Sequence, residues 1–243
     1  MSVKQHVPNA LTCANLVCGC AAILSTVAGN GHHAVFYLLG SLIFDFLDGF
    51  AARLLNVASP LGKQLDSLAD MVSFGVVPGM ILFHLFLKSN FFVLIDNRML
   101  YTIFKYSLFI NTVFSAVRLA KFNMDHRQVD YFIGLPTPAN TIFIASLPLI
   151  LAHDHFGLRP YILNPMILVG IALLFSALMV APIPMLALKF KNFNWQDNKP
   201  QFLLIIIVLL MIPVLKFAAV PAAIIAYLIL SILFKNEIVK IIQ

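Results

Sequence analysis

Eight long apolar segments, separated by short polar stretches, constrain the fold of this 243-residue chain more than any other feature. Most are close to the about 20 residues that an α-helix needs to cross the hydrocarbon core of a bilayer. Their apolar residues run continuously, whereas the strands of a membrane β-barrel alternate apolar and polar positions. The sequence therefore predicts an all-α integral membrane protein, a polytopic bundle of about eight transmembrane helices. The predicted helices cover residues 9–28, 33–54, 64–88, 99–121, 138–154, 160–188, 200–215 and 217–236.

The composition supports this class of protein. The chain is 61% hydrophobic and 11% charged, whereas soluble globular proteins are about half apolar and about a quarter charged. The formal net charge is +6, but the basic residues lie mostly near the ends of apolar segments and not in the patches of a nucleic-acid-binding protein. This placement suits anionic lipid headgroups, so we expect membrane lipids as partners and no nucleic acid. We expect residues 1–243 to form a single membrane domain.

Some boundaries between the segments have alternatives. The last two segments are separated only by the Pro213–Lys216 region, so they could form one long kinked helix, which would leave seven spans. The sixth segment carries Pro182 and Pro184, and a proline in a helix interior bends or ends the helix. Lys4 precedes the first segment, as a basic residue does in a signal peptide, but we interpret this segment as a retained span.

Basic residues predict the orientation of the helices, because cytoplasmic loops carry an excess of lysine and arginine. With eight spans and both termini in the cytoplasm, eleven basic residues fall on the cytoplasmic side and four on the outer side, while Lys105 falls inside a span. We therefore expect a multi-pass protein of the cell (inner) membrane. The cytoplasmic group is Lys4, Arg53, Lys63, Arg118, Lys121, Arg127, Lys189, Lys191, Lys199, Lys235 and Lys240, and the outer group is Lys88, Arg98, Arg159 and Lys216.

Four of the ten acidic residues lie within the 26 residues from Asp45 to Asp70, beside apolar segments. A carboxylate inside a membrane is costly, so such a cluster calls for compensating cations. Asp45 and Asp48 are three residues apart, and Asp66 and Asp70 are four apart, so each pair lies on one face of a helix. The short connection between the helices contains turn-forming residues, namely Ser59, Pro60 and Gly62. The sequence thus predicts four carboxylates in one pocket near the cytoplasmic membrane surface.

This acidic pocket predicts a site for divalent metal ions. Four carboxylates cannot all stay ionised side by side without cations, and oxygen-only ligands favour Mg²⁺, Mn²⁺ or Ca²⁺. Two ions bridged by a carboxylate would neutralise the site and leave positions for phosphate oxygens. Gly49 and Gly62 leave the backbone open to a flat ligand, and Arg53 could meet a phosphate. The alternative is that the aspartates are interface carboxylates paired with Arg53 and Lys63.

The complete pattern D-x2-D-G-x2-A-R-x8-G-x3-D-x3-D over residues 45–70 resembles the signature of the CDP-alcohol phosphotransferase family. These enzymes transfer a phosphatidyl or related phosphoryl group from a CDP-linked donor to an alcohol and release CMP. The resemblance implies that Asp45, Asp48 and Asp66 bind a metal pair, and that Asp70 binds metal and serves as the base for the incoming hydroxyl. It also implies a cytidine nucleotide lying along the residues between these aspartates, namely Gly49, Ala52, Arg53 and Gly62.

Four further stretches resemble the membrane-type phosphatidylserine synthases within that family. They extend over more than half of the chain, whereas about the last hundred residues match only in hydrophobicity. At one position Lys121 stands where many relatives carry arginine, which keeps the charge and loses the bidentate fork. The four stretches are PNALTCANLVCG at 8–19, DSLADMVSFGVVPG at 66–79, RLAKFN at 118–123 and FIGLPTPAN at 132–140.

Polar residues in these stretches are candidates for substrate binding. The charges of Arg118 and Lys121 suit the carboxylate of serine, although they could be ordinary topology-determining residues. Residues 9, 12 and 15 recur along one face of the first span, where they either bind the nucleotide or join helices. We assign Asn9 and Thr12 to the nucleotide, and the candidates for the acceptor alcohol are Asn15, Ser73, Arg118, Lys121 and Thr137.

The resemblance implies transfer of the phosphatidyl group from CDP-diacylglycerol to the hydroxyl of L-serine, which gives phosphatidylserine and CMP. The expected cofactor is Mg²⁺ or Mn²⁺, with Ca²⁺ as a substitute, and the expected assembly is a homodimer. Gly75 and Gly79 would allow the close approach of two helices. One alternative keeps this chemistry with another acceptor, such as glycerol 3-phosphate or an inositol phosphate. A second alternative, from another class, is a divalent-cation transporter that uses the aspartates as a transit site.

Overall fold

The structure, a computed structural model, is a bundle of helices with one small β-pair. It describes residues 3–57, 59–89, 97–124, 132–186, 195–196 and 198–235, with side chains from residue 6 onward and without that of residue 132. The helices are α1 (Val3–Val27), α2 (Gly31–Leu54), α3 (Pro60–Asp70), α4 (Val77–Leu87), α6 (Arg98–Ser107), α7 (Ile110–Met124), α8 (Thr137–His153), α9 (Arg159–Ile162), α10 (Pro165–Val180), α11 (Lys199–Leu215) and α12 (Ala219–Leu233). A π-helix, η1 (Met71–Val76), joins α3 to α4, and a 3-10 turn, η2 (Lys216–Ala218), joins α11 to α12.

Long apolar helices make this chain an integral multi-pass membrane protein. Among the described residues, five helical stretches are long and apolar enough to cross a membrane, and α8 and α10 are shorter apolar helices. Many large apolar side chains on the outside of the bundle are exposed, for example Leu209 at 62% and Leu210 at 68%. Such a surface is far more apolar than a soluble protein tolerates, whereas lipid chains cover it without cost. The predicted bundle of membrane helices is thus confirmed.

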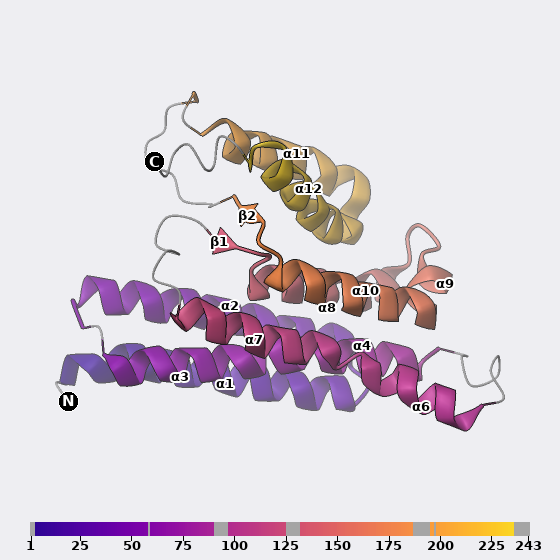
Figure 1. The fold of residues 1–243 in the computed structure, drawn as a ribbon, viewed down its shortest axis with the longest axis horizontal. Coiled ribbons are helices and arrows are strands. Elements are labelled where there is room, and N and C mark those ends of the chain that lie inside the picture. The colour runs from indigo at the N-terminus through magenta and orange to yellow at the C-terminus, as the bar shows by residue number, and fades with distance from the viewer. Residues whose placement is uncertain are drawn as a thin grey trace.

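Eight helical segments correspond to the eight predicted spans. The stretch Lys199–Leu233 is not one long kinked helix: α11 and α12 lie side by side (Figure 1), and Lys216 at the bend has a positive φ of 51°. The sixth helix is shorter than predicted, because α10 begins at Pro165 and ends at Val180, before Pro182 and Pro184. Proline supplies no backbone N–H to continue a helix, which is why the chain leaves helical geometry there.

The described fold is helical apart from one short β-pair. Residues Phe132–Ile133 (β1), from a predicted loop, pair antiparallel with Pro184–Met185 (β2), which fall at the end of the predicted sixth span. The pair joins the segment before α8 to the segment after α10. Some basic residues used to predict the topology lie outside the described part of the chain, namely Arg127, Lys189, Lys191 and Lys240.

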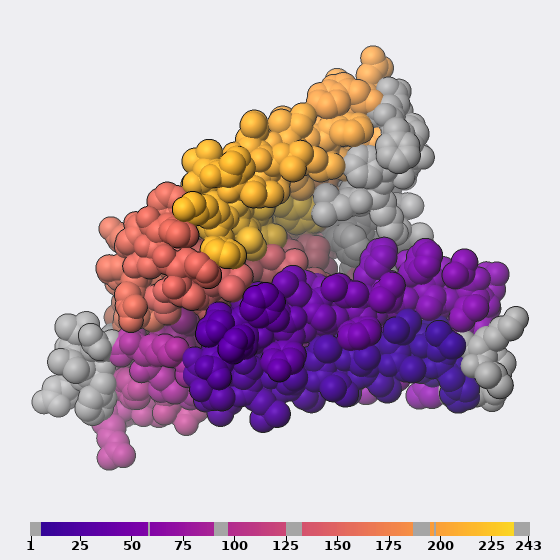
Figure 2. Space-filling view, turned by 180° about the vertical axis from the view of Figure 1, so that it is seen from behind, coloured from indigo at the N-terminus to yellow at the C-terminus, as the bar shows by residue number. Residues whose placement is uncertain are grey.

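The helices are arranged in two layers and a hairpin. Helices α1, α2, α3–α4 and α6–α7 run along one another. Helices α8 and α10 form a second layer beside them in a similar direction, and the α11–α12 hairpin lies on the far side of α8 (Figure 1). Figure 2 shows the same order from behind, with α1 and α2 in indigo and violet and the hairpin in gold. Helix α8 lies at the centre and buries ten of its seventeen residues. The core therefore lies where the two layers meet.

A π-helix follows Asp70 directly, and its irregular backbone is held by threonines from neighbouring helices. The Oγ1 of Thr112 donates to the Gly75 carbonyl at 2.9 Å, and the Oγ1 of Thr141 donates to the Phe74 carbonyl at 2.8 Å. A Cβ at Gly75 would contact Ser115, and one at Gly79 would meet Thr112, so both glycines pack against α7 of the same chain. They serve the fold of one molecule, and the predicted homodimer gains no support from them.

We predict that Gly134→Ala destabilises the protein. Gly134 has a φ of +75°, and a Cβ there would collide with the backbone oxygen of Met179. Strain of this kind costs about 1–3 kcal/mol, and the backbone of α10 cannot move aside cheaply. Thermal unfolding in detergent should therefore occur at a clearly lower temperature. The control is Gly170→Ala in α10, where no atom lies within 4 Å of the new Cβ. Equal melting temperatures for the two variants would contradict this account of Gly134.

Candidate active site

Helices α2 and α3 carry the four aspartates, and the short connection between them is built by local hydrogen bonds. Asn56 adopts a positive φ of 52°, which turns the chain after α2. Ser59 is the N-cap of α3, and its Oγ accepts from the Gly62 backbone N–H at 2.9 Å. Pro60 occupies the first turn of the helix, where no intrahelical N–H is needed. The predicted tight turn therefore reverses the chain after α2, and α3 packs along α1.

Three of the carboxyl groups converge. Asp45, Asp48 and Asp66 each offer an oxygen, and these oxygens all lie within 4.8 Å of one another. Asp48 is only 6% exposed, and its Oδ2 accepts from the Thr12 hydroxyl at 2.6 Å. Three carboxylate oxygens at this separation are the ligand type that Mg²⁺ and Mn²⁺ prefer. The cluster can therefore hold a divalent metal ion.

No protein cation compensates this cluster within the described part of the chain. The exposed Arg53 guanidinium folds back over its own helix, where a Cβ on Gly49 would lie 3.5 Å from it. The Nζ of Lys63 donates to the Asn123 carbonyl at 3.2 Å. The alternative in which Arg53 and Lys63 pair with the aspartates is therefore wrong. Because like charges this close repel strongly, the donor set fits a bound metal better than a set of free carboxylates.

Asp70 lies next to the three clustered aspartates and contacts other side chains as well. Its carboxyl group is within hydrogen-bonding reach of that of Asp45. On another side its Oδ1 accepts from the Asn15 side-chain amide at 3.2 Å. Asp70 is thus the carboxylate that links the acidic cluster to the polar interior of the bundle.

A buried network sets the orientation of the Asn15 amide. Asn15 is fully buried, and its Oδ1 lies 2.8 Å from the hydroxyl oxygens of both Ser41 and Ser73. Its backbone carbonyl is a second acceptor for the same two hydroxyls, at 2.9 and 3.2 Å. Two hydroxyl donors therefore face the oxygen side of Asn15, which leaves its NH₂ to face Asp70. The structure places Asn15 and Ser73 side by side in this network.

Residues of the first helix approach the cluster from a third side. A Cβ on Gly62 would lie 3.2 Å from the Asn9 Oδ1 and 3.0 Å from the Ser59 Oγ, so Asn9 reaches the α2–α3 turn. Thr12 follows one turn later and contacts Asp48. Asn9, Thr12 and Asn15 thus lie on the face of α1 that meets the aspartates, as their spacing predicts. Ala52, on α2 one turn after Asp48, is partly exposed.

Arg118 and Lys121 have different surroundings although they are three residues apart on α7. Arg118 is 7% exposed, and one of its terminal nitrogens donates to the Thr137 hydroxyl at 3.2 Å. Its Nε is buried without a hydrogen-bond partner, and its charge is felt by Asp70 and Tyr227. Lys121 is exposed. Arg118 and Thr137 are therefore buried and hydrogen-bonded to each other, whereas Lys121 lies at the surface.

Sequence reasoning missed four buried polar residues of the bundle interior. Ser41 lies four residues before Asp45 on the same face of α2, and that helical spacing could have revealed it. Asn111 and Asn140 form a reciprocal pair of amide hydrogen bonds, each 3.0 Å long. They come from different helices, so no local pattern links them. Tyr227 of α12 belongs to a part of the chain that the motifs do not reach.

Comparison with known proteins establishes the class. Residues 5–183 match the model of the family described as CDP-alcohol phosphatidyltransferase. The chain belongs to this family, as its motif predicts, and is a phosphatidyltransferase that acts on CDP-alcohol substrates. This finding overturns the alternative of a divalent-cation transporter.

The chain is also similar to individual proteins named CDP-diacylglycerol–serine O-phosphatidyltransferase. It is 35% identical to one from Bacillus subtilis (strain 168) over 159 residues, which are 63% of this chain and 84% of the relative. One from Helicobacter pylori (strain J99) is 32% identical over 228 residues, which are 93% and 89% of the two chains. One from Saccharomyces cerevisiae is 35% identical over 163 residues, or 60% and 55%. The Helicobacter match covers most of the chain and therefore runs into the last hundred residues.

We predict that the purified protein binds Mn²⁺ through the three clustered aspartates. Asp66→Asn should weaken the binding by at least about tenfold, because even the outer residues around metal ligands contribute 10–100-fold to affinity. Electron paramagnetic resonance of free Mn²⁺ measures the affinity directly. The matched control is Asp154→Asn, which keeps the oxygen that accepts from the Arg159 backbone N–H and suits the left-handed φ of 34°. If both variants bound Mn²⁺ equally well, the cluster would not be the metal site.

Proposed function

We propose that this chain transfers the phosphatidyl group of CDP-diacylglycerol to the hydroxyl of L-serine, producing phosphatidylserine and CMP. The observation that carries the proposal is that carboxylate oxygens of Asp45, Asp48 and Asp66 lie within 4.8 Å of one another, with Asp70 adjacent. No protein cation in the described part of the chain pairs with them. Membership of the CDP-alcohol phosphatidyltransferase family supports the reaction. The printed names of the Bacillus, Helicobacter and yeast relatives support serine as the acceptor.

The chemistry requires a base and a pocket that positions the attacking hydroxyl. Asp70 accepts the serine hydroxyl proton while that oxygen attacks the phosphorus that bears the diacylglycerol, and the bond to the CMP oxygen breaks. The Asn15 amide holds the Asp70 carboxylate in place, since its own orientation is set by Ser41 and Ser73. A positioned base of this kind contributes about 10²–10⁴-fold to the rate.

Asp45, Asp48 and Asp66, with Asp70 beside them, would hold the divalent metal, for which Mg²⁺ or Mn²⁺ fits the all-oxygen ligand set. When bound, the metal pair supplies positive charge against the pyrophosphate and the leaving CMP. We assign the nucleotide to the α2–α3 turn, whose small residues leave the backbone accessible. The residues of this surface are Gly49, Ala52, Arg53, Gly62, Asn9 and Thr12.

Arg118 is our candidate for binding the serine carboxylate. It is buried, it keeps a donor nitrogen without a partner, and it lies within electrostatic reach of Asp70. A guanidinium that is already desolvated binds a carboxylate strongly through charge-assisted hydrogen bonds. Thr137 positions the guanidinium through its hydroxyl. The sequence pattern predicts the same role for Lys121, but the exposure of its side chain favours a role in membrane topology.

The membrane arrangement in this proposal has eight crossings in one domain, with both termini and the aspartates facing the cytoplasm of the cell (inner) membrane. The excess of basic residues on that side supports the orientation. In this arrangement the acyl chains of CDP-diacylglycerol enter from the lipid, and serine enters from the cytoplasm. A homodimer stays a prediction.

We predict that Asp70→Asn abolishes formation of labelled phosphatidylserine, with a loss of at least about 10²-fold, because the amide cannot accept the serine proton. The assay supplies CDP-diacylglycerol and labelled serine to purified protein with Mn²⁺. Asp154→Asn serves again as the control and should keep full activity. Full turnover by Asp70→Asn would remove this residue from the mechanism. A panel of other alcohols, including glycerol 3-phosphate and an inositol phosphate, tests the acceptor in the same assay.

We also predict that Arg118→Gln raises KM for serine by at least about tenfold, since a charge-assisted hydrogen bond to the carboxylate is lost. KM for CDP-diacylglycerol should change little. Lys121→Gln, three residues along the same helix and exposed, is the matched control and should leave both values unchanged. A rise in KM for CDP-diacylglycerol alone would assign Arg118 to the donor instead of the acceptor.

A further inference from the structure

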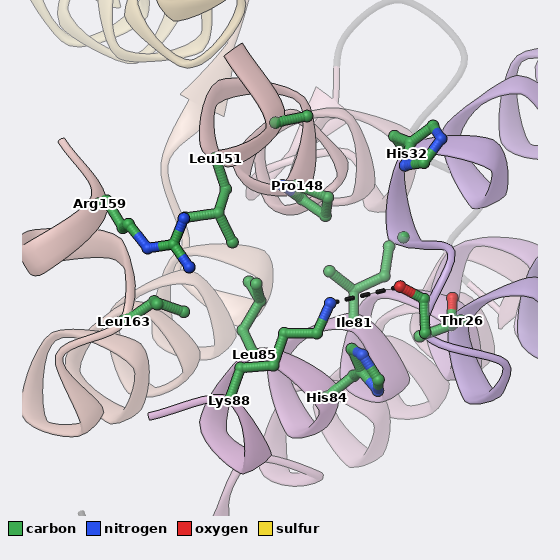
Figure 3. Close-up of a pocket in the computed structure, with 13 residues that line it drawn as sticks. Thr26, His32, Ile81, His84, Leu85, Lys88, Pro148, Leu151, Arg159 and Leu163 are labelled. Atoms are coloured by element: carbon green, nitrogen blue, oxygen red, sulfur yellow. Dashed lines mark hydrogen bonds between the residues drawn. The ribbon is translucent and has the colours of Figure 1, made fainter. Parts of the chain in front are cut away.

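A cavity lies at the end of α2 that is farther from the aspartates, and Figure 3 shows its lining. Its volume is about 410 Å³, and it lies between the ends of α1, α2, α4, α8 and α9. His32 on α2 is among its lining residues, and Asp45 follows thirteen residues later on the same helix. A helix rises about 1.5 Å per residue, so the two sites are about 20 Å apart. The catalytic assignments above make no use of this cavity.

Basic side chains gather around the cavity from α2, from α9 and from the end of α4. Figure 3 shows Lys88, Arg159, His32 and His84 surrounding the same space. None of its described lining residues is an aspartate or a glutamate. The nearest acid along the chain is Asp154, and its carboxylate accepts from the backbone N–H of Arg159 and not from the guanidinium.

These basic groups keep donors that the protein does not use. The Lys88 Nζ donates one hydrogen bond, to the Gly29 carbonyl at 3.3 Å (dashed in Figure 3). An ammonium has three N–H donors, so two are left over. The Nε2 of His84 is buried and has no hydrogen-bond partner. The Arg159 guanidinium likewise makes no hydrogen bond to the described residues.

The remainder of the lining is apolar, including Ile81, Leu85, Leu151 and Leu163. A cavity with cations on one side and aliphatic side chains on the other suits an amphiphile with a negative head. Lysine and arginine near helix ends often extend toward lipid headgroups individually. Here they converge from separate helices on one cavity, which individual placement does not require.

The geometry points to a binding site for a phosphate group, with Arg159 and Lys88 as its main partners, and the apolar lining favours a phosphate carried by an anionic phospholipid. A guanidinium can bind two phosphate oxygens at once, and an ammonium binds phosphate as a point charge. His32 and His84 add further donors. The site is separate from the reaction centre, so it stands or falls independently of the proposed transferase activity.

Native mass spectrometry of the purified full-length protein tests this site. The protein is titrated with phosphatidylglycerol and, in parallel, with diacylglycerol, which has the same chains without the phosphate. A third series adds inorganic phosphate to the phosphatidylglycerol complex. The variants are Lys88→Gln, Arg159→Gln and the pair together, and Arg98→Gln is the control. Arg98 is exposed at the start of α6 and does not line the cavity. Thermal unfolding checks that each variant is folded. If the double variant does not fold, the comparison uses the single variants Lys88→Gln and Arg159→Gln.

Wild-type protein should bind phosphatidylglycerol well above diacylglycerol. The double variant should lower this binding by at least about tenfold, because hydrogen bonds to charged groups are the strong class, and Arg98→Gln should not change it. Displacement of the lipid by millimolar inorganic phosphate would identify free phosphate as a ligand of the same site, and resistance to displacement would identify the lipid. Equal binding of the two lipids, or equal effects of the cavity variants and Arg98→Gln, would overturn the proposal.

Discussion

The repulsion among clustered carboxylates is the constraint on which the functional end of this molecule depends. One carboxylate oxygen from each of Asp45, Asp48 and Asp66 lies within 4.8 Å of the other two, and the described residues supply no lysine or arginine to pair with them. An apolar membrane environment makes such charges costly. The arrangement is therefore stable as a metal site and unfavourable as a purely structural one. This reasoning links the helix pair α2–α3 to the chemistry of a CDP-alcohol phosphatidyltransferase.

The rest of the bundle holds this cluster in register. Helix α1 supplies Thr12 and Asn15 to two different aspartates, so it lies against both α2 and α3. The π-helix after Asp70 is bound to its neighbours, because threonines of α7 and α8 donate to two of its backbone carbonyls. π-Helical segments are rare and often occur at functional sites. A hydrogen-bonded polar network thus runs from Asp70 through Asn15 to Ser41 and Ser73.

Local patterns predicted much of this site, and their failures have physical causes. The aspartates, the α2–α3 turn and the polar face of α1 follow from helical spacing, which is a property of neighbouring residues. The pairing of Arg53 and Lys63 with the aspartates was wrong, because long side chains can turn either way and no spacing rule sets their direction. The spacing of Gly75 and Gly79 indicated close helix packing correctly, but a spacing pattern cannot say whether the partner helix belongs to the same chain.

The sequence by itself determined the membrane class, the eight helical segments and the acidic motif, because hydrophobic length and residue spacing act over a few helical turns. Only the tertiary structure decided which helices meet. It buried Arg118 and left Lys121 exposed, it placed Ser41 and Ser73 around Asn15, and it brought Lys88 and Arg159 to one cavity. These contacts join residues that are far apart along the chain. Their geometry depends on the packing of whole helices, which no local pattern encodes.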